Sequence, residues 1–322
     1  MTKLHMVGAL NQAHFQLMEQ DDKIVVLGED VGVDGGVFRV TDGLIKKFPD
    51  RVFDTPLAEA GIVATSVGMA INGLRPIAEI QFSGFSYQAF YHIKQHLARF
   101  RQRSDGTFTL PMVVRAPCAG GIHALEHHSE SPESFYIHCL GVKVVMPSGP
   151  YNAKGLLAAA VKDPDPVIFL EPKSIYRSFK EEVPDELYEV PLSDANIVRE
   201  GSQLTLVTWG AMLRKSMEAL EQIKDVDVEV IDLRTLWPFD IDKVLQSVKK
   251  TGRAVIVQEA PKTLGLAAEI AARIQEEAML HLEAPIIRVT APDVPFPQYA
   301  LEDYFMPNTK RIMNGIRKAM DF

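Results

Sequence analysis

One carboxylate, that of Glu59, stands where an extended run of the chain changes into a helix-forming one. Val52 and Phe53 are typical of the end of a strand, Pro56 delays helix formation, and the small apolar residues 58–70 favour a helix. Glu59 is therefore expected in the first helical turn, where the macrodipole and unpaired backbone N–H groups stabilise a negative charge. That position has a purely structural explanation, but such a carboxylate can also hold or transfer a proton.

Three histidines, His123, His127 and His128, form a second group that could do chemistry, shortly after the glycine pair Gly120-Gly121. Their density invites comparison with a metal site. The HExxH spacing of helical zinc sites is absent, however, and no suitably placed cysteine or carboxylate completes a ligand set. We therefore predict no metal ligands in this chain. A single imidazole can instead bind a carboxylate or transfer protons, although an isolated histidine is usually a surface or packing residue.

Short apolar runs alternate with helix-like stretches along the chain. The strands and helices that they predict should position Glu59 and the three histidines. Strands are expected at residues 24–27, 77–82, 112–115, 142–146 and 167–170, and helices at 4–20, 59–72, 87–103, 133–138 and 151–162. The strands are apolar throughout rather than at alternate positions, which is typical of a parallel sheet covered on both faces. Residues 1–185 are therefore predicted to form a doubly wound α/β domain.

A second α/β domain is expected at residues 203–322, after a charged, turn-rich linker at 186–202. Its predicted strands are 204–209, 226–233, 254–258 and 285–289, and its predicted helices are 212–224, 240–250 and 264–280. No catalytic cluster stands out in this part. Its Glu259, Asp293 and Arg234 are single charges near strand ends, which are usually ion-paired or solvated.

Composition narrows the classes of partner. A net charge of −8 and a pI near 5.6 argue against nucleic acid and acidic membranes. Two cysteines, Cys118 and Cys139, are too few for a disulfide framework and fit a reducing compartment. The amino terminus lacks the pattern of a secretory signal, and no apolar run approaches the roughly 18 residues that span a bilayer. We expect a cytoplasmic protein.

A set of motifs resembles one family closely, over essentially the whole chain. These motifs are LGEDV at 27–31, GGVFR at 35–39, DTPLAE at 54–59, AEIQF at 78–82, GGIH at 120–123, VVMPS at 144–148, FLEP at 169–172 and VIDLRT at 230–235. In this order and spacing, they resemble the beta subunit of the thiamine-diphosphate-dependent decarboxylating component of 2-oxo acid dehydrogenase complexes. The resemblance implies a pyrimidine-binding α/β domain followed by a transketolase C-terminal-like domain.

The resemblance also implies roles for individual residues. In the family, the residue corresponding to Glu59 contacts the pyrimidine ring nitrogen of the cofactor, and proton exchange there prepares the thiazolium carbon for attack on the 2-oxo acid. Phe85 matches the position of an aromatic ring that stacks on the pyrimidine. Gln81 and Leu57 are expected to line the same pocket. His128 matches an active-site histidine that acts during acyl transfer to a lipoyl group.

One family feature of thiamine enzymes is missing. The GDG sequence that binds magnesium diphosphate, with its later asparagine, does not occur in this chain. The resemblance therefore implies that an alpha subunit supplies the Mg²⁺ ligands, in an assembly of two alpha and two beta chains. It further implies docking of a dihydrolipoyl acyltransferase core, to which the carboxyl-terminal residues 319–322 could contribute. Family members can also bind K⁺ through backbone carbonyls.

The motifs do not determine which substrate the family member would use. Residues 131–135 with 138–139, and residues 295–297, look more like branched-chain members, whereas 54–59, 81–85 and 167–171 also resemble bacterial pyruvate members. We expect branched-chain 2-oxo acids ahead of pyruvate, and an acetoin-cleaving enzyme is a third alternative. A non-catalytic scaffold subunit is disfavoured because Glu59, Phe85 and His128 are all in place. A dinucleotide-binding dehydrogenase is disfavoured because no G-x-G-x-x-G follows the first strand.

Overall fold

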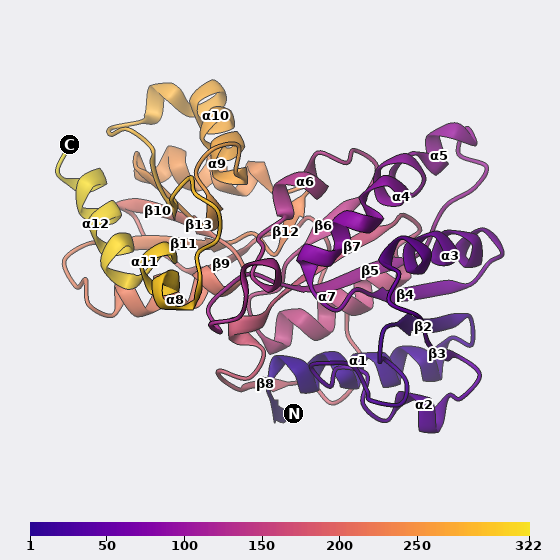
Figure 1. Ribbon diagram of the computed structural model, residues 1–322. Helices are drawn as coiled ribbons and strands as arrows, with labels where there is room; N and C mark the ends of the chain where they lie inside the picture. Colours follow the sequence, from indigo (N-terminus) through magenta and orange to yellow (C-terminus); the bar gives the residue numbers. More distant parts are fainter.

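Two parallel sheets lie side by side in the computed structural model, which describes residues 1–322 (Figure 1). The larger sheet has seven strands in the order β12-β6-β7-β5-β4-β2-β3, and all are parallel except β12. Their bounds are β2 Ile24–Gly28, β3 Val52–Asp54, β4 Arg75–Glu79, β5 Val113–Cys118, β6 Lys143–Val145, β7 Val167–Pro172 and β12 Thr235–Trp237. A short antiparallel pair, β1 (Thr2–Leu4) and β8 (Glu181–Val183), lies apart from it.

Helices cover both faces of the larger sheet. On one face, α1 (Met6–Gln20) packs against α7 (Pro150–Lys162). The opposite face carries α3 (Glu59–Ile71), α4 (Phe90–Gln95) and α6 (Glu133–Ile137) (Figure 1). Two shorter helices, α2 (Leu44–Lys47) and α5 (Phe100–Arg103), lie in connections. This is the doubly wound arrangement that the uninterrupted apolar strands predict.

The second sheet has five strands in the order β14-β13-β10-β11-β9, parallel except for β9. Its strands are β9 Asn196–Arg199, β10 Leu204–Thr208, β11 Val228–Asp232, β13 Ala254–Pro261 and β14 Ile287–Ala291. Helices α8 (Ala211–Leu220) and α12 (Thr309–Met320) cover one face, and α9 (Ile241–Thr251) and α10 (Leu266–Ala278) cover the other. Helix α11 (Glu302–Phe305) precedes α12.

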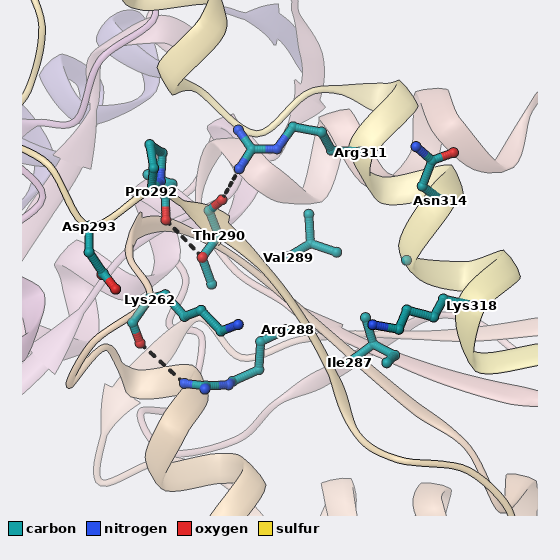
Figure 2. Close-up of a pocket in the computed structure, with 12 residues that line it drawn as sticks. Lys262, Ile287, Arg288, Val289, Thr290, Pro292, Asp293, Arg311, Asn314 and Lys318 are labelled. Atoms are coloured by element: carbon teal, nitrogen blue, oxygen red, sulfur yellow. Dashed lines mark hydrogen bonds between the residues drawn. The ribbon is translucent and has the colours of Figure 1, made fainter. Parts of the chain in front are cut away.

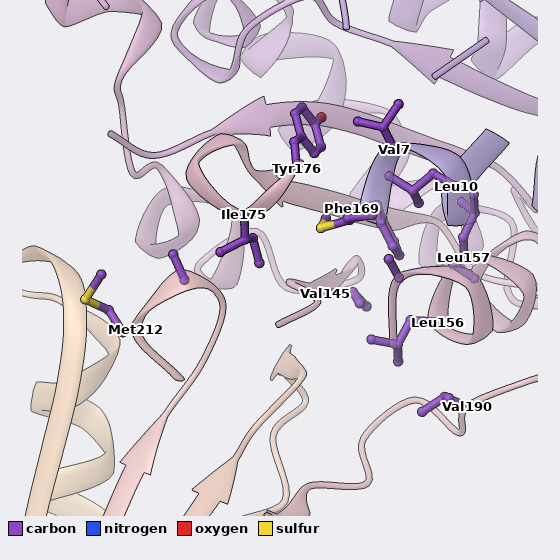
Figure 3. Close-up of a cluster of buried hydrophobic side chains, with 14 of the residues drawn as sticks. Val7, Leu10, Val145, Leu156, Leu157, Phe169, Ile175, Tyr176, Val190 and Met212 are labelled. Atoms are coloured by element: carbon purple, nitrogen blue, oxygen red, sulfur yellow. The ribbon is translucent and has the colours of Figure 1, made fainter. Parts of the chain in front are cut away.

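Alternation along each strand divides the apolar side chains between two cores. In β7, Val167 and Phe169 enter one core and Ile168 and Leu170 enter the other. Figure 3 shows part of the first core, where Leu156 and Leu157 of α7 and Val7 and Leu10 of α1 surround Phe169, and Met212 of α8 belongs to the same cluster. Both cores include residues of both sheets, so burial of apolar surface joins the two halves of the chain.

The observed elements match most of the expected ones, with informative differences. The expected helix at 87–103 is broken into 3₁₀ turns and the short helices α4 and α5. Residues 186–202 contain β9, which pairs antiparallel with β11, and β12 leaves the second half of the chain to join the first sheet. The division into 1–185, 186–202 and 203–322 stays a prediction beside these two findings. Helix α12 was not expected from the sequence.

A buried ionic network crosses three neighbouring strands of the larger sheet. Arg115 of β5 is completely buried and donates to Glu79 of β4 and, with Nε and Nη2, to the two carboxylate oxygens of Glu171 of β7 at 2.8 and 2.6 Å. Tyr176 also donates to Glu171. Such a network is tolerable in the interior because each charge has an opposite partner and hydrogen bonds. It lies directly beneath the edge where the candidate site is built.

Candidate active site

The carboxyl ends of the parallel strands place the expected functional residues along one edge of the larger sheet. Glu29 follows β2, Glu59 follows β3, and Phe85 follows β4. His128 follows β5 in the 3₁₀ turn η3 (Glu126–His128), and Lys173 follows β7 in η4 (Lys173–Ile175). Because neighbouring parallel strands end at the same edge, segments far apart in sequence meet there. Ligands of open α/β sheets bind in this kind of position.

Glu59 is the first residue of α3 and is buried, with only 2% of its surface exposed. One of its carboxylate oxygens, Oε2, is buried without a hydrogen-bond partner. A buried polar atom in this state is unusual in a folded protein and costs about 1–3 kcal/mol. The oxygen is therefore suited to bind a donor group of a ligand.

A second carboxylate, Glu29, belongs to this site but was not identified as a functional residue from the sequence. It is buried, and neither of its carboxylate oxygens has a hydrogen-bond partner. Burial, and then the negative charges of Glu59 and Asp30, raise the pKa of Glu29 to about 7. A carboxyl group with this pKa can take up and release a proton near neutral pH. Its position at the end of a buried strand, in the LGED motif, was the available signal.

Phe85 and His128 come together through a cluster of aromatic rings. His128 stacks on Phe82 with ring centroids 4.0 Å apart and lies edge-on to Phe85 at 5.5 Å. Phe85 also contacts His127 at 5.8 Å. Burial is the main cause that lowers the pKa of His128, and the charges of His127 and Lys173 act in the same direction. The imidazole is therefore neutral at physiological pH, with its orientation set by Phe82.

The other expected pocket residues occupy the rim of the site. Gln81 donates from its side-chain amide to Asp30 Oδ2 at 2.7 Å. Leu57 is 74% exposed, two residues before the buried Glu59. Leu57 is therefore an apolar surface residue in the isolated chain, available to a ligand or to a second protein.

Lys173 adds a buried cation to the same edge. Its ammonium group donates to the carbonyl of Ala119 and lies 5.9 Å from the centre of the Phe82 ring. Burial lowers the pKa of Lys173 to about 8. The nearby thiol of Cys118 is also completely buried, and burial raises its pKa well above the usual value. This thiol is therefore protonated and unsuited to act as a nucleophile.

The three histidines do not share a common centre. His123 lies against Tyr299 of the second half of the chain, with ring centroids 4.6 Å apart, and its Nδ1 is 3.5 Å from Glu302 Oε2. His127 packs beside His128 at 4.3 Å. No group of three or more histidine, cysteine or acidic side chains is arranged to hold a metal ion. Of the three, His128 has the closest contacts with the aromatic cluster.

A groove also lies elsewhere, between β14 and α12 in the second sheet (Figure 2). It has a volume of about 430 Å³ and carries Lys262, Arg288, Arg311 and Lys318, together with Asp293. Two of the guanidinium groups already donate to backbone carbonyls, as the dashed lines in Figure 2 show. None of the residues of the sheet-edge site lines this groove. This groove is therefore separate from the candidate active site.

The geometry of the sheet edge supports proton transfer beside a bound ring. It combines an unpaired buried carboxylate, a second carboxyl group with a raised pKa, a partly buried phenyl ring and a neutral imidazole. A buried carboxyl group with a raised pKa beside other polar groups is typical of sites of acid–base catalysis.

Comparison with known proteins defines the class. Residues 2–178 match the family described as transketolase, pyrimidine binding domain, and residues 193–312 match transketolase, C-terminal domain. The fold also resembles a solved structure entitled split gene transketolase, inactive beta4 tetramer, with a TM-score of 0.82, 22% identity and coverage of 99% of both chains. The predicted fold, a pyrimidine-binding α/β domain followed by a transketolase C-terminal-like domain, is therefore confirmed.

Curated relatives narrow the class further. The pyruvate dehydrogenase E1 component subunit beta of Acholeplasma laidlawii is 51% identical, covering 99% of this chain and 98% of the relative. The protein of the same name from Bacillus subtilis strain 168 is 47% identical over the full length of both. This chain belongs to the family of 2-oxo acid dehydrogenase E1 beta subunits.

The structure contains no helix with the length and apolar character needed to cross a membrane.

Proposed function

We propose that this chain is the beta subunit of the thiamine-diphosphate-dependent decarboxylating component of a pyruvate dehydrogenase complex. The observation that carries the proposal is the buried Glu59 at the sheet edge, whose Oε2 has no hydrogen-bond partner within the chain. The names of the relatives from Acholeplasma and Bacillus support the same function. The acyl product would pass to a lipoyl group, as in a lipoamide-dependent 2-oxo acid dehydrogenase.

The side chains at this edge fit the aminopyrimidine half of thiamine diphosphate. Glu59 would accept a hydrogen bond from a ring nitrogen, which removes the cost of its unpaired oxygen. Phe85 offers a ring face, Leu57 an exposed apolar surface and Gln81 an amide. When bound, the cofactor supplies an electron sink for loss of carbon dioxide from the 2-oxo acid.

The chain's own residues would then handle protons and orientation. Glu59 would accept a proton from the ring nitrogen, or return it, at Oε2, and Glu29 would exchange protons at the same edge because its pKa is about 7. His128 binds the substrate carboxylate or moves a proton during acyl transfer. Phe82 fixes the plane of that imidazole by stacking and keeps water from one of its faces.

An alpha subunit is needed to complete the site. The chain lacks the GDG sequence, so the partner would supply the diphosphate contacts and the Mg²⁺ ligands. Exposed apolar side chains at the site and its neighbouring loops support a covering partner: Val33, Leu57, Ile122 and Leu125. We propose two alpha and two beta chains, in the cytoplasm. Binding of K⁺ and docking of a dihydrolipoyl acyltransferase core through the second domain stay predictions.

Pyruvate is the substrate that the relatives' names favour. The preference for branched-chain acids that we inferred from residues 131–135, 138–139 and 295–297 stays an untested alternative, as does acetoin. The test is decarboxylation of pyruvate, 3-methyl-2-oxobutanoate and 4-methyl-2-oxopentanoate by this chain, alone and with its alpha subunit, in the presence of thiamine diphosphate and Mg²⁺. Turnover only in the mixture, fastest with pyruvate, is expected. Turnover by the isolated chain, or none in the mixture, would overturn the proposal.

A further inference from the structure

We propose that Lys173, Glu259 and Glu302, here called the charged trio, are positioning residues that fix the loop carrying His128. Two of them, Glu259 and Glu302, belong to the second half of the chain, so this half would set the geometry of the active-site imidazole. The inference rests on the proposed function and adds residues to it.

The first part of the loop is bound at three consecutive residues. The ammonium group of Lys173 donates to the carbonyl of Ala119, and the backbone N–H of Gly120 donates to Glu259 Oε1 at 2.6 Å. The backbone N–H of Gly121 donates to Glu302 Oε1. All three members of the trio are buried. Hydrogen bonds between backbone groups and buried charged side chains are stronger than neutral ones.

Glu259 also reaches the other end of the same loop. Its Oε1 accepts a second hydrogen bond, from Ser131 Oγ at 3.4 Å. The two ends are joined directly as well, because the N–H of Ala119 donates to the carbonyl of Glu130 at 2.7 Å. The segment 119–131 is therefore closed at its base, with Glu259 bound to both ends and His128 between them.

Backbone conformation explains why the loop needs these contacts. Ala119 and His123 adopt left-handed φ values of 69° and 55°, which are unfavourable for residues with a side chain. Gly121 has a φ of 87°, and a Cβ added at Gly120 would lie 2.7 Å from the ring of Phe296. The loop thus holds a strained path in close contact with the second half of the chain. Surrounding interactions must stabilise such a path.

Further contacts bind the middle of the loop to both sides. Gln298 donates to Glu126 Oε2 at 3.3 Å, and His123 lies against Tyr299. On the opposite side, His128 stacks on Phe82. Movement at the base of the loop would therefore shift the imidazole relative to the aromatic cluster. Displacements of about 1 Å in a catalytic group can lower a rate by about a hundredfold.

The test uses the assembled complex with its alpha subunit and compares Glu259→Leu with Glu259→Gln. Leucine leaves the N–H of Gly120 buried without an acceptor, whereas the glutamine carbonyl can still accept it. We expect Glu259→Leu to speed hydrogen exchange in residues 119–131 about tenfold. The kcat of lipoyl acylation should fall by about tenfold or more, while the affinity for thiamine diphosphate stays close to wild type. Glu259→Gln should restore both exchange and kcat.

A matched control and a second pair of variants keep the result interpretable. Glu229→Gln changes another buried glutamate of the second half, which binds Lys250 and does not touch the loop; exchange in 119–131 should be unchanged. If Glu259→Leu does not fold, Glu302→Leu and Glu302→Gln probe the contact with Gly121 in the same way.

Several outcomes would overturn the inference. These are unchanged exchange in the leucine variants, equal effects of leucine and glutamine, or faster exchange with normal acylation. Failure of the proposed function is a separate result, because it would show as no turnover by the wild-type complex. The exchange measurement would still test the contacts of the charged trio in that case.

Discussion

Two buried carboxyl groups, Glu29 and Glu59, share the carboxyl-end edge of the larger sheet. Their environment keeps one oxygen of Glu59 and both oxygens of Glu29 without hydrogen-bond partners. Such an arrangement lowers stability in the absence of a ligand, and active sites commonly contain interactions of this kind.

Replacing Glu59 by glutamine should abolish decarboxylation while the complex with the alpha subunit stays assembled. The amide preserves size but cannot exchange a proton, so we expect a loss of at least about a hundredfold in kcat. The measurement is carbon dioxide release, with assembly checked by size-exclusion chromatography. Glu229→Gln is the matched control, since Glu229 is equally buried but far from the site in sequence and in fold. Near-normal turnover of the Glu59 variant would exclude the proposed role.

Replacing His128 by alanine should reduce acylation of lipoyl groups more than decarboxylation measured with an artificial electron acceptor. Burial lowers the pKa of this imidazole, so it stays neutral as the pH falls through the usual histidine range. Wild-type acylation that depends on the neutral ring should therefore persist below pH 6.5. Normal rates of both reactions in the alanine variant would make His128 a structural residue.

The raised pKa of Glu29 predicts a pH-dependent effect on stability. Its pKa is about 7 in the folded chain and about 4.3 in an unfolded one. Between these values the folded state binds more protons, so Glu29 lowers the free energy of unfolding as the pH rises towards 7. Glu29→Gln removes this penalty. We expect the gain in Tm over wild type to be larger at pH 8 than at pH 5, and an equal gain at both would contradict the assigned pKa.

At the scale of elements, the ionic network between β4, β5 and β7 supports the edge on which the site is built. Arg115 is completely buried between Glu79 and Glu171. Replacing it by methionine leaves two buried carboxylates without their cation, which should lower the free energy of unfolding by about 3–5 kcal/mol. Denaturant titration measures this change.

A surface variant provides the comparison. Arg273→Met breaks an ion pair with Glu277 on the outside of α10, where solvent screens the charges. Its effect on the denaturation midpoint should be much smaller than that of Arg115→Met. Similar effects of the two variants would mean that the buried network contributes no more than a surface pair.

For the whole molecule, the exposed apolar side chains near the site predict where the alpha subunit binds. Val33 is 83% exposed in the loop after β2, close in sequence to the buried Glu29. Val33→Asp should weaken association with the alpha subunit, because burying a charge in an interface without a partner is unfavourable. Analytical ultracentrifugation of the mixture measures the loss.

Leu280→Asp gives a matched comparison for this prediction. Leu280 is 92% exposed in the 3₁₀ turn after α10, in the second half of the chain. The same charge at this position should leave association with the alpha subunit unchanged. Equal weakening by both substitutions would contradict an interface at the site edge.

Some elements could be predicted from the sequence because their signals are local. Pro56 and the small residues after Ala58 indicated that a helix begins near Glu59, and α3 begins at that residue. Continuous apolar runs indicated the buried parallel strands. The helix expected at 87–103 was wrong in its continuity, because residues 83–89 and 97–99 form 3₁₀ turns instead. Strands β9 and β12 escaped prediction because their pairing partners are distant in sequence.

The sequence by itself determined the family, the two α/β units and the candidates Glu59, Phe85 and His128, because motif order and apolar periodicity are properties of neighbouring residues. Only the tertiary structure decided which charges are buried and which groups they contact. Glu29 acquires its raised pKa from burial beside Glu59. Glu259, expected from sequence to be an ordinary ion-paired or solvated charge, is buried against Gly120, 139 residues away. Burial and the partner of a charge arise from packing between distant segments, which a local pattern does not contain.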